Sequence, residues 1–184
     1  MSQTIRRPST KGFTLMETMI ALAVLAIGIL GLAAMLGDAM AYMESSQYDY
    51  IAQQKAEEAA EAIFTAKYNN PNNWAAISNN TLANPAGLFL VGPQPLLQPS
   101  PTGLVGSVDD VGAPPEVITL PGPDGMLGTA DDVQMPLTGF TRTIAIGPVA
   151  GNANVRTITI TMTYTAAKFF NRTYVLNTYI SAFN

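Results

Sequence analysis

A run of twenty residues without a charge, residues 18–37, most constrains what this chain can fold into. As an α-helix that rises about 1.5 Å per residue, the run spans about the hydrocarbon thickness of a bilayer. Arg6, Arg7 and Lys11 precede it, and Asp38 is the first charge after it. The positive-inside tendency therefore predicts an N-terminus in the cytoplasm and the rest of the chain across the inner membrane.

Hydropathy alone leaves three interpretations of this segment open. A secretory signal peptide would have a shorter apolar core and a cleavage site after it, for which Ala33 and Ala34 could serve. A plain membrane anchor would stay uncut. Neither interpretation explains Glu17, a carboxylate at the front edge of the apolar run, because an ionisable group there is costly and by default functional.

The residues around Glu17 carry a resemblance to a known family. The heptapeptide Lys-Gly-Phe-Thr-Leu-Met-Glu, residues 11–17, resembles the processing site of type IV prepilins and type II secretion pseudopilins. The resemblance implies that a prepilin peptidase cuts after Gly12 and methylates Phe13 as the new N-terminus. It also implies that Glu17 pairs with the N-terminal amine of a neighbouring subunit, because a buried pair is tolerated where a lone charge is not.

The continuation of the run narrows the resemblance. Residues 21–34 are similar to PilV-type minor pilins and GspI-type pseudopilins, and the helix-bending proline of major pilins is absent near Ala34. The resemblance implies three partners besides the membrane that a single helix crosses: other pilin or pseudopilin subunits, the prepilin peptidase and an inner-membrane assembly platform. It implies a location in the inner membrane before assembly, and then in a periplasmic or cell-surface filament.

Helical periodicity continues beyond the membrane run. Tyr48, Ile51, Ala52, Ala59, Ile63 and Ala66 share one face of a helix to about Tyr68, and Tyr50, Gln53, Glu57 and Glu61 lie opposite. Lys55 is an intruder on the apolar side, which we expect to extend its amine to the edge. A helix of about 55 residues is too long for a globular core. We therefore expect a membrane or filament-core half and a second half that packs on a sheet.

The remainder of the chain changes character twice. Residues 71–137 are rich in proline and glycine, with short strands predicted at residues 87–91 and 116–120. Residues 157–164 alternate threonine with Ile, Met and Tyr, which predicts a strand flanked by strands at 140–146 and 173–180. Turns are predicted at residues 147–152 and 167–171.

These patterns predict an α+β, pilin-like fold in which a long N-terminal helix packs against a C-terminal antiparallel sheet. The expected segments are a leader (1–12), a transmembrane or filament-core helix (13–37), its amphipathic continuation (38–70), a variable region (71–137) and the sheet (138–184).

An acidic loop, residues 121–132, is the one candidate for metal binding. Asp124, Asp131 and Asp132 are oxygen ligands of the type that calcium prefers, and two glycines allow the backbone to turn. The spacing does not fit an EF-hand, and Asp and Gly are also common in solvated turns. Calcium is therefore predicted as a possible cofactor of this loop, beside the alternative of a plain turn.

Composition excludes several functions. The chain has no cysteine and no histidine, so a Ser/His/Asp or Cys/His catalytic set is impossible, and no phosphate-binding glycine loop is present. We predict no catalytic residues. Removal of residues 1–12 takes three of nine basic residues and leaves six against thirteen acidic, a charge of −7 that disfavours nucleic acid as a partner. The leading hypothesis is a structural filament subunit; the alternative is a non-polymerising, membrane-anchored binding protein.

Overall fold

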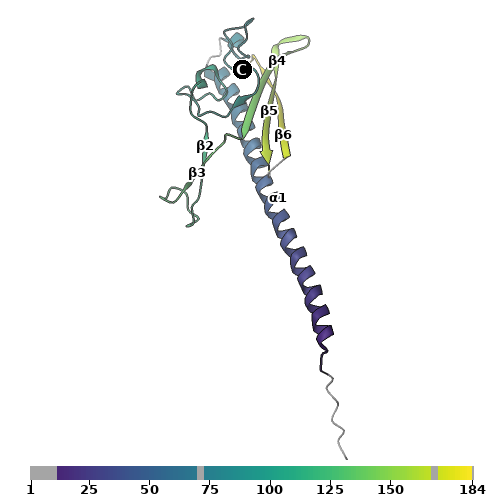
Figure 1. The fold of residues 1–184 in the computed structure, drawn as a ribbon. Coiled ribbons are helices and arrows are strands. Elements are labelled where there is room, and N and C mark those ends of the chain that lie inside the picture. Colours follow the sequence, from purple (N-terminus) through teal and green to yellow (C-terminus); the bar gives the residue numbers. More distant parts are fainter. Residues whose placement is uncertain (1–11, 70–72, 167–169, 184) are drawn as a thin grey trace, which may run out of the picture. The chain divides into compact units, whose positions relative to one another are not determined.

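The computed structural model describes residues 12–69, 73–166 and 170–183 (Figure 1). A single α-helix, α1 (Leu15–Asn69), is followed within these residues by six strands and two short 3-10 helices. The contacts divide the chain into two units, residues 1–43 and 44–184, and the boundary falls inside α1. The first unit contains the N-terminal part of α1, and the second contains the rest of α1 and all of the strands.

The second unit contains a four-stranded antiparallel sheet in the order β1-β4-β5-β6. Its strands are β1 (Gln94–Pro95), β4 (Phe140–Val149), β5 (Asn152–Ala166) and β6 (Phe170–Ser181). The three long strands are the predicted meander, and each extends beyond its predicted bounds. Residues 147–149 belong to β4 rather than to the predicted turn, which is confined to Ala150 and Gly151. The predicted turn at 167–171 lies mostly outside the described residues.

The alternation of threonine with larger apolar residues in β5 is confirmed. Ile158, Ile160, Met162 and Tyr164 are buried, whereas the intervening threonines are at least partly exposed. The register sets Ile160 opposite apolar partners on both sides, in the row Ile144, Ile160 and Leu176. One face of the sheet is therefore apolar, as the period of two predicts.

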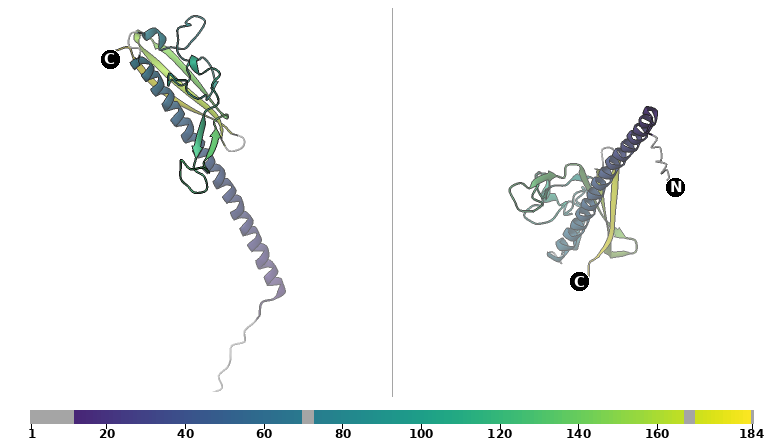
Figure 2. Two further views of the ribbon diagram at one scale, coloured as in Figure 1. Left: turned by 90° about the vertical axis from the view of Figure 1, so that its left-hand side faces the viewer. Right: turned by 90° about the horizontal axis from the view of Figure 1, so that it is seen from below.

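The part of α1 that lies in the second unit covers this apolar face (Figures 1 and 2). Tyr48 of α1 meets Phe140 edge to face at 5.7 Å between ring centroids, and Phe140 stacks on Tyr164 at 5.3 Å. The predicted stripe is confirmed, because its members are buried or half-buried and the residues predicted opposite are exposed. The buried residues of α1 are Ala52, Ala56, Ala59, Ala60, Ala62, Ile63 and Ala66.

Residues 73–137 contain little regular structure, yet they complete the core. A second, two-stranded sheet pairs β2 (Val117–Leu120) with β3 (Val133–Pro136), and β2 matches the strand predicted at 116–120. The strand predicted at 87–91 is wrong: only Phe89 forms isolated bridges there. The buried apolar residues of this region are Ala76, Ile77, Phe89, Leu96, Leu104, Val105 and Leu137.

The sequence predicted that the amine of Lys55 would extend to the edge of the apolar stripe. The structure differs from this prediction. The Lys55 amine forms ion pairs with Glu58, at 2.6 Å, and with Glu116, which is buried just before β2. Burial lowers the pKa of Lys55, but the bonds to Glu116 and Glu58 outweigh it and the pKa is raised. The lysine is tolerated on this face because two carboxylates accompany it.

Arg142 of β4 lies in the same charged region and is only 2% exposed. Burial lowers its pKa, and the charges of Glu116, Glu58 and Asp110 oppose that effect. Asp110 is itself buried and accepts the backbone N–H groups of Ser100 and Ser107, at 3.0 and 3.1 Å. A buried group of charges thus joins α1, the irregular region and the sheet. The α+β fold class, with a long N-terminal helix packed on an antiparallel sheet, is confirmed.

Candidate processing and assembly site

The residues that the heptapeptide resemblance singled out lie just before α1 and in its first turn. Gly12 and Phe13 precede α1 and are exposed, with 81% of the Phe13 surface accessible. Thr14 is the N-cap, because its hydroxyl oxygen accepts the backbone N–H of Glu17 at 3.2 Å. Lys11 lies outside the described residues. The peptide bond between Gly12 and Phe13 therefore lies in an exposed segment, without helix or strand, just before a capped helix.

Glu17 occupies the third helical position, where a carboxylate lies near the positive end of the helix dipole. Its side chain is exposed, and within the described residues no basic side chain forms an ion pair with it. The local fold thus places a negative charge at the start of the apolar run, close in sequence to Phe13, the residue predicted to become the N-terminus.

Between Phe13 and Met43, every large apolar side chain is exposed. An 18-residue window of α1 has a mean hydropathy of 2.7 and none of it is buried, so the helix is long and apolar enough to cross a membrane. Gly28 and Gly31 face open space, where an added methyl group would meet nothing within 4 Å. No contact within the described chain requires glycine at these two positions.

The three aspartates of the acidic loop accept hydrogen bonds from within the loop itself. Asp124 accepts the N–H of Met126 at 2.8 Å, and Asp132 accepts that of Gly128 at 2.7 Å. The Thr129 hydroxyl donates to Asp131 at 2.7 Å and the N–H of Asp124 donates to it at 3.3 Å; these bonds lower the pKa of Asp131. Within the described residues, no three acidic side chains converge as they would around a metal ion. Calcium stays a prediction.

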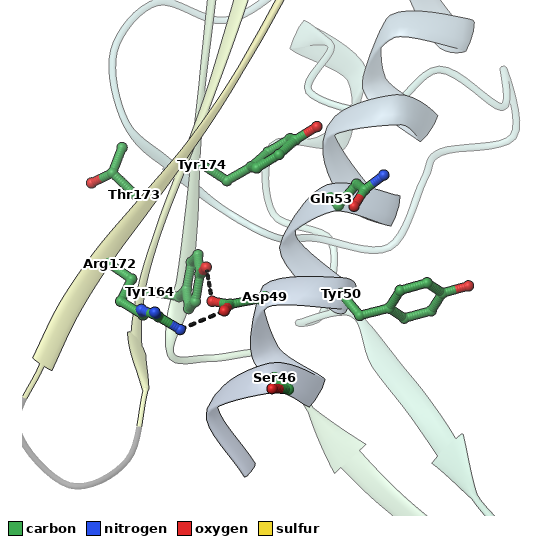
Figure 3. A pocket seen from close by; sticks show the side chains of 8 residues that line it. All are labelled: Ser46, Asp49, Tyr50, Gln53, Tyr164, Arg172, Thr173 and Tyr174. Atoms are coloured by element: carbon green, nitrogen blue, oxygen red, sulfur yellow. Dashed lines mark hydrogen bonds and ion pairs between the residues drawn. The ribbon is translucent and has the colours of Figure 1, made fainter. Parts of the chain in front are cut away.

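Sequence reasoning missed a groove of about 520 Å³ beside the start of β6 (Figure 3). Asp49 of α1 lies at its centre, where it accepts hydrogen bonds from the hydroxyl of Tyr164 and from the guanidinium of Arg172. Arg172 also donates to the Ser45 hydroxyl at 2.7 Å. Burial, followed by the bond to Asp49, raises the pKa of Tyr164 to about 12. These contacts join α1 to β5 and β6, and no periodicity in the sequence indicates them.

The comparisons with known proteins bear on the N-terminal segment alone. Residues 7–33 match the family model described as the prokaryotic N-terminal methylation motif. The match includes Gly12, Phe13 and Glu17 and most of the uncharged run. No curated protein and no solved structure matches the chain. The N-terminal segment of this chain therefore carries the prokaryotic N-terminal methylation motif, on a helix apolar enough to anchor it in a membrane.

Proposed function

We propose that this chain is a structural subunit of a type IV pilus or a type II secretion filament, as a minor pilin or pseudopilin. It is cut after Gly12, methylated at Phe13 and assembled from the inner membrane through the N-terminal part of α1. The observation that carries the proposal is the methylation motif at residues 7–33, on a helix whose large apolar side chains are exposed from Leu15 to Met43.

The first turn of α1 provides a physical reason for assembly through Glu17. After cleavage, the amine of Phe13 would place a positive charge at the positive end of a helix dipole, which is unfavourable. A carboxylate from a neighbouring helix would offset that charge in an apolar environment where water cannot. Glu17 is exposed and unpaired within the described chain, so it is free to serve a neighbour in this way.

The apolar run offers the surface for this contact. Membrane helices gain little from apolar area alone and associate through close packing, which small residues permit. Gly28 and Gly31 lie on α1 with open space beside them, so a second helix can approach its backbone there. The proposed partners are the prepilin peptidase before assembly, the inner-membrane platform during assembly, and other pilin or pseudopilin subunits in the filament. The proposed final location is periplasmic or at the cell surface.

Substitution of Glu17 tests this proposal. Glu17→Ala should leave membrane insertion intact and reduce recovery of the chain in sheared filaments, as measured by quantitative immunoblotting of the membrane and filament fractions. The matched control is Glu57→Ala, which removes an exposed carboxylate from the second part of the same helix. Normal incorporation of the Glu17→Ala chain would contradict the role assigned to this carboxylate.

A further inference from the structure

An apolar groove lies between α1 and the β2–β3 ribbon, which runs beside the helix (Figures 1 and 2). The groove has a volume of about 750 Å³ and is lined by residues of both elements. Four of these residues, Tyr48, Ile51, Ile118 and Met135, are half-buried and pack against the hydrophobic core. The core is therefore left partly open along this side of α1. We call this feature the ribbon groove.

The ribbon groove contains no charge. None of the ten residues that line it is ionised at neutral pH, and two of them, Tyr50 and Leu120, add apolar surface that is 68% and 40% exposed. Its volume lies in the range of sites that enclose drug-sized ligands, so the groove can take several side chains. A charged group placed there would lose water without gaining a partner. The matching occupant is therefore apolar and uncharged.

The uncharged run, residues 18–37, has these properties. Its large apolar side chains are all exposed in the single chain. Lipid covers them in the membrane, but in the proposed filament the run leaves the lipid and must be covered by protein to stay out of water. The run and the groove residues 46–54 both belong to α1. A helix cannot pack beside a later part of itself, so a run that fills the groove comes from a second copy.

The membrane fixes the direction of this contact. Chains that are inserted with the same orientation have α1 helices that run in the same direction. The groove residues of α1 lie wholly beside the uncharged run of a neighbour that is displaced along the helix, away from the membrane, by about 25–40 Å at about 1.5 Å per residue. A parallel, staggered neighbour can therefore fill the groove, and an unstaggered one cannot.

We propose that the ribbon groove of one subunit receives the uncharged run of a neighbouring subunit in the filament. The β2–β3 ribbon then covers apolar side chains of the neighbour that lipid covered before assembly. This inference rests on the proposed filament function and deepens it, because it assigns a part of the irregular region to the contact between subunits.

Photocrosslinking in the full chain tests this contact. The photoreactive residue p-benzoylphenylalanine replaces Leu120, and this chain is co-expressed with a second, unsubstituted copy that carries a different epitope tag. Sheared filaments are irradiated, and the crosslinked peptides are mapped by mass spectrometry. The matched control places the same photoreactive residue at Val111, an apolar residue of the irregular region that is 69% exposed and does not line the groove.

The expected result is a dimer that carries both tags, with the crosslink from position 120 mapped to residues 18–37 of the other copy. The probe at position 111 should give no crosslink to that run. If the probe at position 120 reacts only with lipid, or only with strands of another copy, the proposal is overturned.

A charge in the groove gives a second measurement. Leu120→Glu should lower recovery of the chain in sheared filaments at least about tenfold, because the carboxylate would be buried without a partner. Val111→Glu should leave recovery unchanged. Gln54→Glu adds a charge of nearly the same size at an exposed groove position, so it gives the same readout if Leu120→Glu fails to fold. Normal recovery of both groove variants would contradict the proposal.

The N-terminal mass, measured on the same samples, separates this inference from the proposed function. If chains that begin at Phe13 enter filaments without the crosslink from position 120, the groove contact is wrong and the filament function stands. If the chain stays uncut and is absent from filaments, the filament function is wrong and the groove contact falls with it.

Discussion

The two parts of α1 use apolar residues in opposite ways. Between Leu15 and Met43 the helix presents large side chains such as Leu25 and Ile27, and all of them are exposed. From Glu44 onward, the buried positions are six alanines and Ile63. Small side chains occur where the helix approaches its own sheet and loops, and large ones occur where the isolated chain offers nothing to cover them.

The apolar content of a helical face therefore does not by itself predict what that face contacts. In the second unit, the buried alanines of α1 share one hydrophobic core with Ile158 and Ile160 of β5 and with Leu96 of the irregular region. In the first unit, an exposed surface of leucine, isoleucine and methionine requires lipid or other helices. The difference between the two parts of α1 can be tested by making the same kind of substitution in each part.

The largest contrast is expected from one substitution made twice. Ile63→Ala removes a fully buried side chain and should lower the free energy of unfolding of the second unit by about 2–5 kcal/mol. Ile27→Ala, at a position that is 71% exposed, should leave that stability unchanged. Urea unfolding of the full chain in detergent, followed by fluorescence of the single tryptophan, Trp74, measures both. Equal losses would contradict the division of α1 into two parts.

A smaller loss is expected when the half-buried Lys55 loses its charge. Lys55→Met leaves the Glu116 carboxylate buried without its partner and should cost about 1.5–3 kcal/mol, measured by the same unfolding experiment. Lys67→Met is the matched control, because Lys67 lies in the last turn of α1 and donates one bond, to the Phe183 carbonyl at 2.7 Å. A loss in Lys67→Met as large as that in Lys55→Met would show that the buried pair has no special role.

The groove at Asp49 predicts a dependence of stability on alkaline pH. The folded state holds the Tyr164 proton more tightly than the unfolded state, because the pKa rises from 10.0 to about 12. The stability from this group is therefore complete below pH 10 and is lost as the pH rises toward about 12, by on the order of 2 kcal/mol. Tyr164→Phe should unfold with a shallower alkaline slope, whereas Tyr174→Phe should keep the original slope. Identical slopes in all three proteins would refute this assignment.

The smallest effect is expected in the acidic loop. If calcium binds there, the melting temperature should be higher in calcium than in EDTA, and Asp131→Asn should abolish the difference. Asp109→Asn, at an exposed aspartate outside the loop, is the control. Equal melting temperatures, with no heat in titration calorimetry, would remove calcium and leave a turn held by its own hydrogen bonds.

The periodic elements of the fold could be predicted from the sequence because one face of each is buried. The stripe on α1 and the alternation along β5 both follow from that burial, and the structure confirms them. The irregular region could not be predicted in the same way. Phe89 and Leu96 are buried there without any repeating pattern, because non-local contacts rather than local periodicity place them in the core.

The functional and charged residues also differ in how far the sequence could predict them. Gly12, Phe13 and Glu17 are contiguous in sequence, so a local motif could reveal them. The ion pairs of Lys55 with Glu116 and of Asp49 with Arg172 join residues far apart in the chain, and only the fold brings them together. The sequence predicted that Lys55 would extend toward water, because nothing local indicated that Glu116 would meet it.

The most direct test of the central claim is the mass of the N-terminus in protein purified from its native membrane or sheared filament fraction. The account predicts a chain that begins at Phe13 and carries one additional methyl group. A chain that begins at Met1 or Ser2 would contradict it and favour an uncut, membrane-anchored binding protein. Cleavage near Ala34 would indicate an ordinary exported protein and exclude assembly through the N-terminal helix.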